Sequence, residues 1–166
     1  MGWIQKTMAF FKIVQNKLLW AISQQTAAEL VYRRVDASLP LLGMLGFDTK
    51  DSATVKKTDV SIAKNYLNED EMKLLGLLVE QYLAFAETMA QQRNPMHMAD
   101  WSQRLDAILQ LNERELLIHA GNISHDQALE KSSEEFKKYK SAQNTIEKEE
   151  SLKEIESDIK QLKKKM

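Results

Sequence analysis

The sequence has no cysteine, five glycines, two prolines and no long uninterrupted apolar stretch in its 166 residues. The lack of cysteine excludes a disulfide-stabilised scaffold and a thiol nucleophile. No stretch reaches the roughly 18 consecutive apolar residues that a membrane-spanning helix needs, so we expect no membrane partner. Lys12 and Lys17 interrupt the apolar N-terminal stretch, and no small-residue cleavage site follows it. We therefore expect a cytoplasmic protein, with secretion into a host left open.

An excess of charge of one sign is also lacking, because 23 basic residues balance 24 acidic ones. This balance argues against a generic polyanion-binding protein. The hydrophobic fraction of 43% suits a folded chain, and the length suits one domain of ordinary size. Charge is concentrated in residues 129–166, where 19 of 38 residues are charged and neither glycine nor proline occurs. That composition predicts a long solvated helix or a frayed tail.

Helix-start signals recur along the chain. A Ser, Thr or Asn followed three residues later by Glu or Gln can satisfy two free backbone N–H groups at a helix N-terminus. The pattern occurs four times, each time next to an apolar-periodic segment: Thr26…Glu29, Asn68…Glu71, Asn112…Glu115 and Ser124…Gln127. We predict a helix start at each of the four.

Apolar spacings of three and four residues predict an all-α fold, a single helical domain of about six to seven helices with a long charged C-terminal helix. The helices expected before the charged region cover residues 4–22, 27–36, 58–67, 69–91, 99–111 and 113–120, with residues 38–53 as one long loop. Leu74 and Leu77 widen the apolar stripe of the 69–91 helix, which predicts burial on more than one side. We divide the chain into a helical domain, residues 1–146, and a charged helical tail, residues 147–166.

The tail has apolar residues at the a/d spacing of a coiled coil: Leu152, Ile155, Ile159, Leu162 and Met166. The apolar residues upstream follow another register, so we expect the chain up to about Ile146 to dock on the domain. Two heptads fall short of the three or four that support a firm coiled-coil prediction. The tail is therefore a weak dimer contact or a frayed helix, and we favour the dimer.

Candidate catalytic and metal-binding groups are few. His119 and His125 are six residues apart, not the four that put two imidazoles on one helix face. Ser124, His125 and Asp126 are the residue types of a catalytic triad, but neighbours at a helix start point in different directions. The sequence has no Gly-x-Gly-x-x-Gly motif and no phosphate loop. We expect no metal and no cofactor, and we assign no catalytic residue.

Two polar groups stay open as functional candidates. Asp100, Arg104 and Asp106 lie near Trp101, although Asp100 and Arg104, four residues apart, are equally an ordinary surface ion pair. Basic residues gather in the first part of the chain: Arg33, Arg34, Lys50, Lys56, Lys57 and Lys64. Lys57 and Lys64 share a face if one helix contains both. Acidic residues lie between these phosphate-binding candidates, so nucleic-acid contact by this chain alone is the weaker expectation.

Four strings resemble the C-terminal region of the bacterial RhuM family, named for a virulence-associated protein: VQNKLLWAI…TAAELVYRRVDAS, VKKTDVSIAKNYLNEDE, MADWSQRLDAILQLNERELLIHAG and ISHDQA. The similarity covers residues 11–136. Fuller-length members also carry an N-terminal region resembling phage-type DNA-binding modules, so this chain resembles a C-terminal half. The resemblance implies no catalytic residues. It marks a candidate functional surface made of Lys57, Lys64, Tyr66, Asp100, Arg104, Asp106, His119 and His125.

Two functions follow as hypotheses. The first is a non-enzymatic helical module for protein association, from a RhuM-type regulator or mobile-element protein. Its partner is a protein, and a second copy of the chain is one candidate. The alternative is an enzyme acting on nucleotides or nucleic acid through a polar cleft. That cleft would include Lys64, Tyr66, Asp106, His119 and His125, and their convergence would support this alternative.

Overall fold

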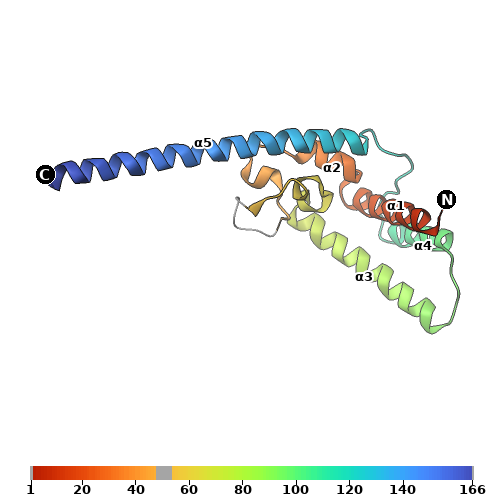
Figure 1. Ribbon diagram of the computed structural model, residues 1–166. Helices are drawn as coiled ribbons and strands as arrows, with labels where there is room; N and C mark the ends of the chain where they lie inside the picture. The colour runs from red at the N-terminus through yellow and green to blue at the C-terminus, as the bar shows by residue number, and fades with distance from the viewer. Residues whose placement is uncertain (1, 48–53, 166) are drawn as a thin grey trace.

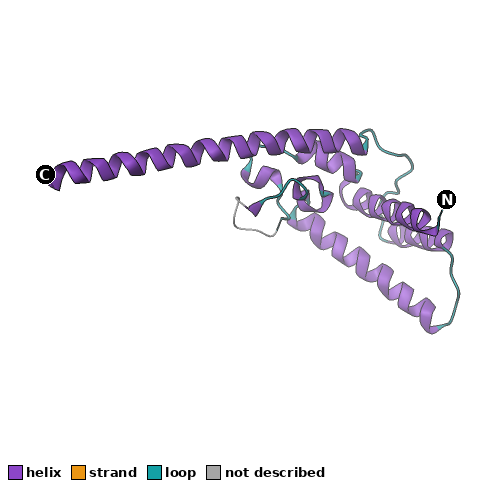
Figure 2. Ribbon diagram, in the orientation of Figure 1, coloured by secondary structure: helices purple, strands orange, loops and turns teal. Residues whose placement is uncertain are grey.

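The computed structural model describes residues 2–47 and 54–165, and these residues form helices and loops with no strand (Figure 2). The all-α prediction is confirmed for this part of the chain. Within these two ranges, five α-helices are connected by loops and by short 3₁₀ turns (Figure 1). In chain order the elements are α1 (Trp3–Ser23), α2 (Ala27–Arg34), η1 (Pro40–Gly43), η3 (Asp59–Ser61), η4 (Ala63–Tyr66), α3 (Glu69–Gln91), α4 (Met98–Leu111) and α5 (His125–Lys165).

Three of the four predicted helix starts are confirmed. Asn68 and Glu71 form a reciprocal capping box at α3, with N–H to side-chain oxygen distances of 2.8 and 3.0 Å. Ser124 and Gln127 make the same pair of bonds before α5, at 3.1 and 2.8 Å. At α2, the hydroxyl oxygen of Thr26 accepts the N–H of Glu29 at 3.2 Å. The local sequence therefore sets where these three helices begin.

The helices α1, α3 and α4 contact one another in pairs, and α1 lies beside α4 while α3 diverges from both (Figure 1). Their contact buries apolar side chains from each helix: Leu18, Leu19, Ala21 and Ile22 of α1, Leu78 of α3, and Leu105 and Leu109 of α4. Polar links between the helices also hold the group together. The Lys17 ammonium of α1 lies 2.8 Å from the Asp106 carboxylate of α4. The side-chain amides of Gln81 and Asn112 bond each other in both directions, at 3.0 and 2.7 Å.

The second packed unit consists of α2, the 3₁₀ turns and the first part of α5. Its core includes Leu30, Val31, Leu42, Met44, Val60, Tyr66, Leu67, Ala128 and Tyr139. Arg34 connects this unit to the start of α3. Its guanidinium donates to the Tyr66 carbonyl at 2.9 Å and to both Glu71 carboxylate oxygens at 2.6 and 2.9 Å. The sequence pattern places Arg34 in a basic cluster, and the structure gives it an ion pair inside the fold.

The described residues form five α-helices and not the expected six to seven helices, and two expected helices account for the difference. Residues 58–67 form two 3₁₀ turns, η3 and η4, separated by Ile62 in an extended conformation. Residues 113–120 contain no helix. Because Glu113 has a positive φ of 60°, the N–H groups of Glu113 and Arg114 fold back onto the carbonyls of Gln110 and Leu109. This closure ends α4.

The Asn112…Glu115 pattern therefore marks the end of α4 and not the start of a helix. The Asn112 side chain donates back to the Ile108 carbonyl at 2.8 Å and bonds Gln81 of α3. The Asn112 side chain is therefore not available to cap a helix that would begin after it. Arg114 anchors the outgoing chain instead, because its Nε donates to the Ala21 carbonyl at 2.8 Å.

The prediction that α3 is buried on more than one side holds for only one of the two residues behind it. Leu74 is partly buried and packs against the core, whereas Leu77 is exposed, and Leu78 is the only residue of α3 that is fully buried. Nothing lies within 4 Å of the position where a Cβ would sit on Gly76. This glycine is therefore a tolerated residue on an open face, and no neighbouring helix crosses closely there.

Candidate association surface

Two of the sequence-predicted surface residues, Tyr66 and Asp106, are engaged inside the fold. Tyr66 is fully buried, and its hydroxyl donates to the Val60 carbonyl at 2.5 Å. Burial raises the pKa of this phenol. The Asp106 carboxylate accepts two hydrogen bonds from Lys17, at 2.8 and 3.0 Å, and Lys17 also donates to Ser102 at 3.0 Å. Both candidates thus make contacts that stabilise packed elements.

The other candidates of α4 and the linker lie elsewhere. Asp100 accepts the N–H of His97 at 3.0 Å and so caps α4, and it forms no pair with Arg104. The Arg104 guanidinium lies 6.0 Å from the centre of the Phe85 ring. His119 packs edge-on against Trp20 at a centroid distance of 4.8 Å, and its Nδ1 accepts the N–H of Gly121 at 3.0 Å.

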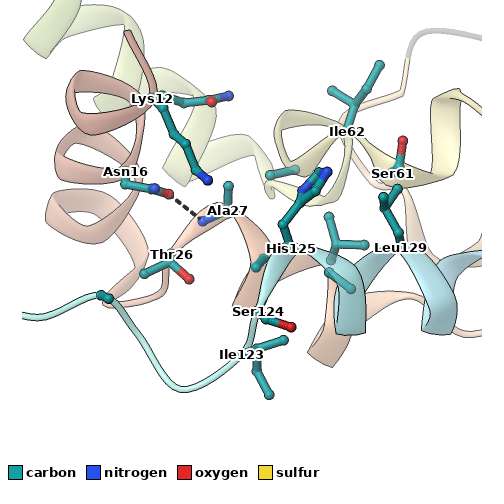
Figure 3. Close-up of a pocket in the computed structure, with 16 residues that line it drawn as sticks. Lys12, Asn16, Thr26, Ala27, Ser61, Ile62, Ile123, Ser124, His125 and Leu129 are labelled. Atoms are coloured by element: carbon teal, nitrogen blue, oxygen red, sulfur yellow. Dashed lines mark hydrogen bonds between the residues drawn. The ribbon is translucent and has the colours of Figure 1, made fainter. Parts of the chain in front are cut away.

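His125 lines a polar pocket of about 560 Å³ between α1, α2, η3 and the start of α5 (Figure 3). The pocket also contains Lys12, Asn16, Ser61 and Thr26, and no acidic side chain lines it. Its polar groups are partly committed, because Asn16 accepts the Ala27 N–H at 2.9 Å. The pocket is lined by none of the other four residues of the expected enzymatic cleft.

The predicted basic cluster does not form one surface in the described residues. Arg33 pairs with Glu29 at 3.2 Å and Arg34 pairs with Glu71 at 2.6 Å. Lys57 is exposed before η3 and Lys64 is exposed within η4, so no single helix contains both. Lys50 lies outside the described residues. With its two arginines paired to carboxylates, the cluster keeps the lysines Lys56, Lys57 and Lys64, among the described residues, for contact with a polyanion.

Residues 2–47 and 54–165 contain no group of three or more His, Asp or Glu side chains placed to hold a metal ion. They also contain no helix that is both long and apolar enough to cross a membrane.

An apolar groove of about 620 Å³ lies between α1 and α3. Met8, Phe11 and Val14 of α1 line one side, and Leu75 and Val79 of α3 line the other. The groove also has two basic residues, Lys12 and Lys64, in its lining. Lys64 therefore borders a different cavity from His125.

The most extended surface belongs to α5, which continues far beyond the rest of the molecule (Figure 1). Its contacts with the domain use Ala128, Ser132 and Tyr139, and every described residue after Gln143 is exposed. Docking thus ends slightly before Ile146, which is 53% exposed. The apolar seam residues that follow remain largely in solvent: Leu152 is 60% exposed, Ile155 54%, Ile159 47% and Leu162 65%.

The model of the virulence protein RhuM family matches residues 3–148. The chain belongs to this family. No curated protein and no solved structure matches the chain. The family match covers α1 to α4 and the docked part of α5, and it ends before the exposed seam of Leu152 to Leu162.

Of the residues that line these two cavities of the RhuM family member, Lys64 and His125 are sequence-predicted candidates and the others are not. Lys12, Asn16 and Ser61 meet in the polar pocket from segments far apart in the chain. The apolar groove is likewise lined by residues of α1 and α3, which are far apart in the chain. Spacing within one helix carries no information about such contacts. The seam of α5 could be found, because all its residues belong to one helix.

Proposed function

We propose that this chain is a non-enzymatic protein-association module and that it pairs with a second copy through the tail of α5. The observation that carries the proposal is the exposed apolar seam of Leu152, Ile155, Ile159 and Leu162 on a helix that leaves the domain. The four side chains repeat at a/d spacing, so they form one stripe along the helix. A helix that is fully solvated needs no such stripe, whereas a helix that contacts a partner does.

The length of the free segment fits this role. Residues 144–165 are exposed and helical, and a helix rises about 1.5 Å per residue, so the tail reaches roughly 30 Å beyond its last contact. Most of the stability of helices in proteins comes from the packing of an apolar face, which this segment has but does not bury. Pairing would bury the seam and stabilise the tail.

The enzymatic alternative finds less support in the geometry. Its five candidate residues occupy separate places, because Tyr66 is buried, Asp106 pairs with Lys17 and His119 packs on Trp20. Lys64 and His125 line different cavities. Acid–base and nucleophilic chemistry needs its groups within hydrogen-bond reach of one another or of one substrate. We therefore favour association.

The proposal is tested by placing charge on the seam of the full chain. Ile155→Asp combined with Ile159→Asp should shift the chain from dimer to monomer, because a paired seam would have to bury two carboxylates. Ser157→Asp combined with Gln161→Asp is the matched control, since these positions lie off the seam and add the same charge. Sedimentation velocity at several concentrations measures the change.

If both double variants dimerise as well as the unchanged chain, the seam is not the contact and the proposal fails. Circular dichroism of each variant checks that the domain remains folded. All four substituted positions of the two double variants lie in the exposed part of α5, so the domain should remain folded.

A further inference from the structure

We infer that the tail of α5 docks its apolar seam in the apolar groove between α1 and α3 of a second copy. The inference rests on the proposed function, because it assumes that the tail meets another copy of the chain. It goes beyond that function by naming the surface that receives the seam. The groove and the seam match in apolar character, in length and in charge, and the path of α5 excludes docking within one copy.

The groove leaves large apolar side chains in solvent. Met8 and Phe11, which line its α1 side, are 67% and 63% exposed. Leu75 and Val79 of α3 are partly buried against the core and line the other side. A groove between two packed helices commonly receives the apolar face of a third helix. A helix seated there would remove Met8 and Phe11 from water.

The seam and the groove have similar lengths. Leu152 and Leu162 are ten residues apart, which corresponds to about 15 Å along a helix. Met8 and Leu19, the first and last α1 residues that line the groove, are eleven residues apart, or about 16 Å. One groove can therefore cover the whole seam of one tail.

The groove also offers the seam more apolar surface than a second seam does. Seven apolar side chains from α1 and α3 are among the described residues that line the groove, whereas a tail presents four in its exposed seam. The seam extends over two heptads, fewer than the three or four that support a coiled coil. A short seam is thus better covered by two helices that are already packed together.

Charge on the two surfaces is opposite. The groove has Lys12 on α1 and Lys64 on η4, the turn that leads into α3, and no acidic side chain is among its described lining residues. With Ile159 as an a position, Glu156 and Asp158 are e and g residues, one on each side of the seam. A docked tail can therefore bring a carboxylate toward the lysine on either side of the groove. Complementary charge of this kind selects a partner and fixes its register.

The path of α5 makes this docking intermolecular. The helix runs from His125 to Lys165, and its tail extends away from α1 and α3 (Figure 1). The tail therefore cannot reach the groove of its own copy while the helix is intact. Each copy supplies one tail and this groove, so an exchange of tails between two copies closes a two-fold dimer.

Unique cysteines can detect this contact, because the full chain contains none. Gln15→Cys places a thiol in the groove lining and Ser151→Cys places one beside the seam, and both keep the apolar and charged side chains of the contact. The two full-length variants are treated with a short bismaleimide, separately and as a mixture. Gels and peptide mass spectrometry identify the linked dimers. We expect the mixture to give at least several-fold more linked dimer than either variant alone.

A matched control uses another position on α1. Gln5 is exposed and does not line the groove. A mixture of Gln5→Cys with Ser151→Cys should give no more linked dimer than either variant alone. Equal linkage of Ser151→Cys to Gln5→Cys and to Gln15→Cys would show that the tail does not select the groove, and the inference would be wrong.

Charge reversal on the groove is an independent test in the full chain. Lys12→Glu combined with Lys64→Glu should weaken dimerisation several-fold in sedimentation velocity, because the groove would then repel the carboxylates beside the seam. Lys73→Glu combined with Lys137→Glu makes the same change of charge at exposed positions outside the groove lining. This control should dimerise like the unchanged chain.

Restoration of pairing separates this contact from a general effect of charge. Glu156→Lys combined with Asp158→Lys should weaken dimerisation by itself. A chain that carries these two changes together with Lys12→Glu and Lys64→Glu should recover it, since both surfaces are then reversed. A chain with all four changes that dimerises no better than either double variant would contradict the docking of the seam in the groove.

The remaining outcomes of the linking experiment overturn the inference. Linkage of Ser151→Cys to itself, without linkage to Gln15→Cys, would show that the tails pair with each other, and the proposed function would stand. Linkage of Gln15→Cys to itself alone would show that two grooves face each other. A chain that dimerises without linkage in any combination pairs through another surface. A chain that stays monomeric in sedimentation removes both this inference and the proposed function.

Discussion

At the scale of single residues, Glu71 shows how a surface-like sequence position becomes structural. Sequence alone identifies it as half of a capping box, and the structure adds the paired bonds to Arg34 at 2.6 and 2.9 Å. The hydrogen bond from Arg34, followed by the backbone N–H of Asn68, lowers the pKa of Glu71 below its ordinary value of 4.5, despite partial burial. One carboxylate thus joins α2 to the start of α3.

This shift makes folding stability depend on pH. A carboxylate with a lowered pKa stabilises the fold above about pH 4.5, and that contribution is lost as the pH falls through the lower folded-state value. Glu71→Gln should therefore be less stable than the unchanged chain near neutral pH and differ from it less in acid. Urea unfolding at about pH 7 and about pH 4 measures this difference. Glu80→Gln, an exposed change on the same helix, is the control, and an equal pH response in both variants would contradict the assignment.

Two glycines should respond to alanine in opposite directions. Gly76 has open space around it in the middle of α3, so Gly76→Ala should stabilise the protein by about 0.5–1 kcal/mol. Gly43 has a φ of +84°, and a Cβ there would lie 2.6 Å from the Arg34 carbonyl oxygen. Gly43→Ala should cost at least about 1–2 kcal/mol. Thermal or urea unfolding measures both, and a gain at Gly43 would show that this turn can rearrange.

At the scale of elements, sequence reasoning succeeded where one segment carries the whole signal. The cap and the apolar spacing of residues 69–91 give α3 its observed bounds, Glu69–Gln91. Sequence-based prediction failed where a contact between residues far apart in the chain decides the local structure. Asn112 bonds Gln81 of α3, and Arg114 bonds the Ala21 carbonyl of α1, so the expected helix after α4 does not form. No pattern in the neighbouring sequence indicates that Asn112 will bond Gln81 or that Arg114 will bond Ala21.

The tail of α5 is an element whose removal the domain should tolerate. A chain ending at Asn144 keeps the buried contacts of Ala128, Ser132 and Tyr139, and the described residues that it loses, 145–165, are exposed. Its free energy of unfolding, extrapolated to low protein concentration, should lie within about 0.5 kcal/mol of the full chain. Urea unfolding measures the difference. A truncated chain that fails to fold would show that the tail belongs to the core.

At the scale of the whole molecule, the chain combines a packed helical domain with a projecting helix (Figure 1). Membership of the RhuM family covers the packed part and the beginning of the projection. The all-α class and the seam could be predicted from the sequence, because periodicity within a helix reports which face needs cover. The positions of the two cavities could not be predicted from the sequence, and neither could the separation of the residues expected to form an enzymatic cleft. Both depend on how α1, α3 and the start of α5 meet.

The most direct test of the account is the molecular mass of the full chain as a function of concentration, measured by sedimentation equilibrium. The account predicts a reversible rise from the 19.1 kDa of one chain toward twice that value, and no such rise for the chain ending at Asn144. A mass that stays at 19.1 kDa across the range would contradict tail-mediated pairing, as would equal dimerisation of the full and truncated chains.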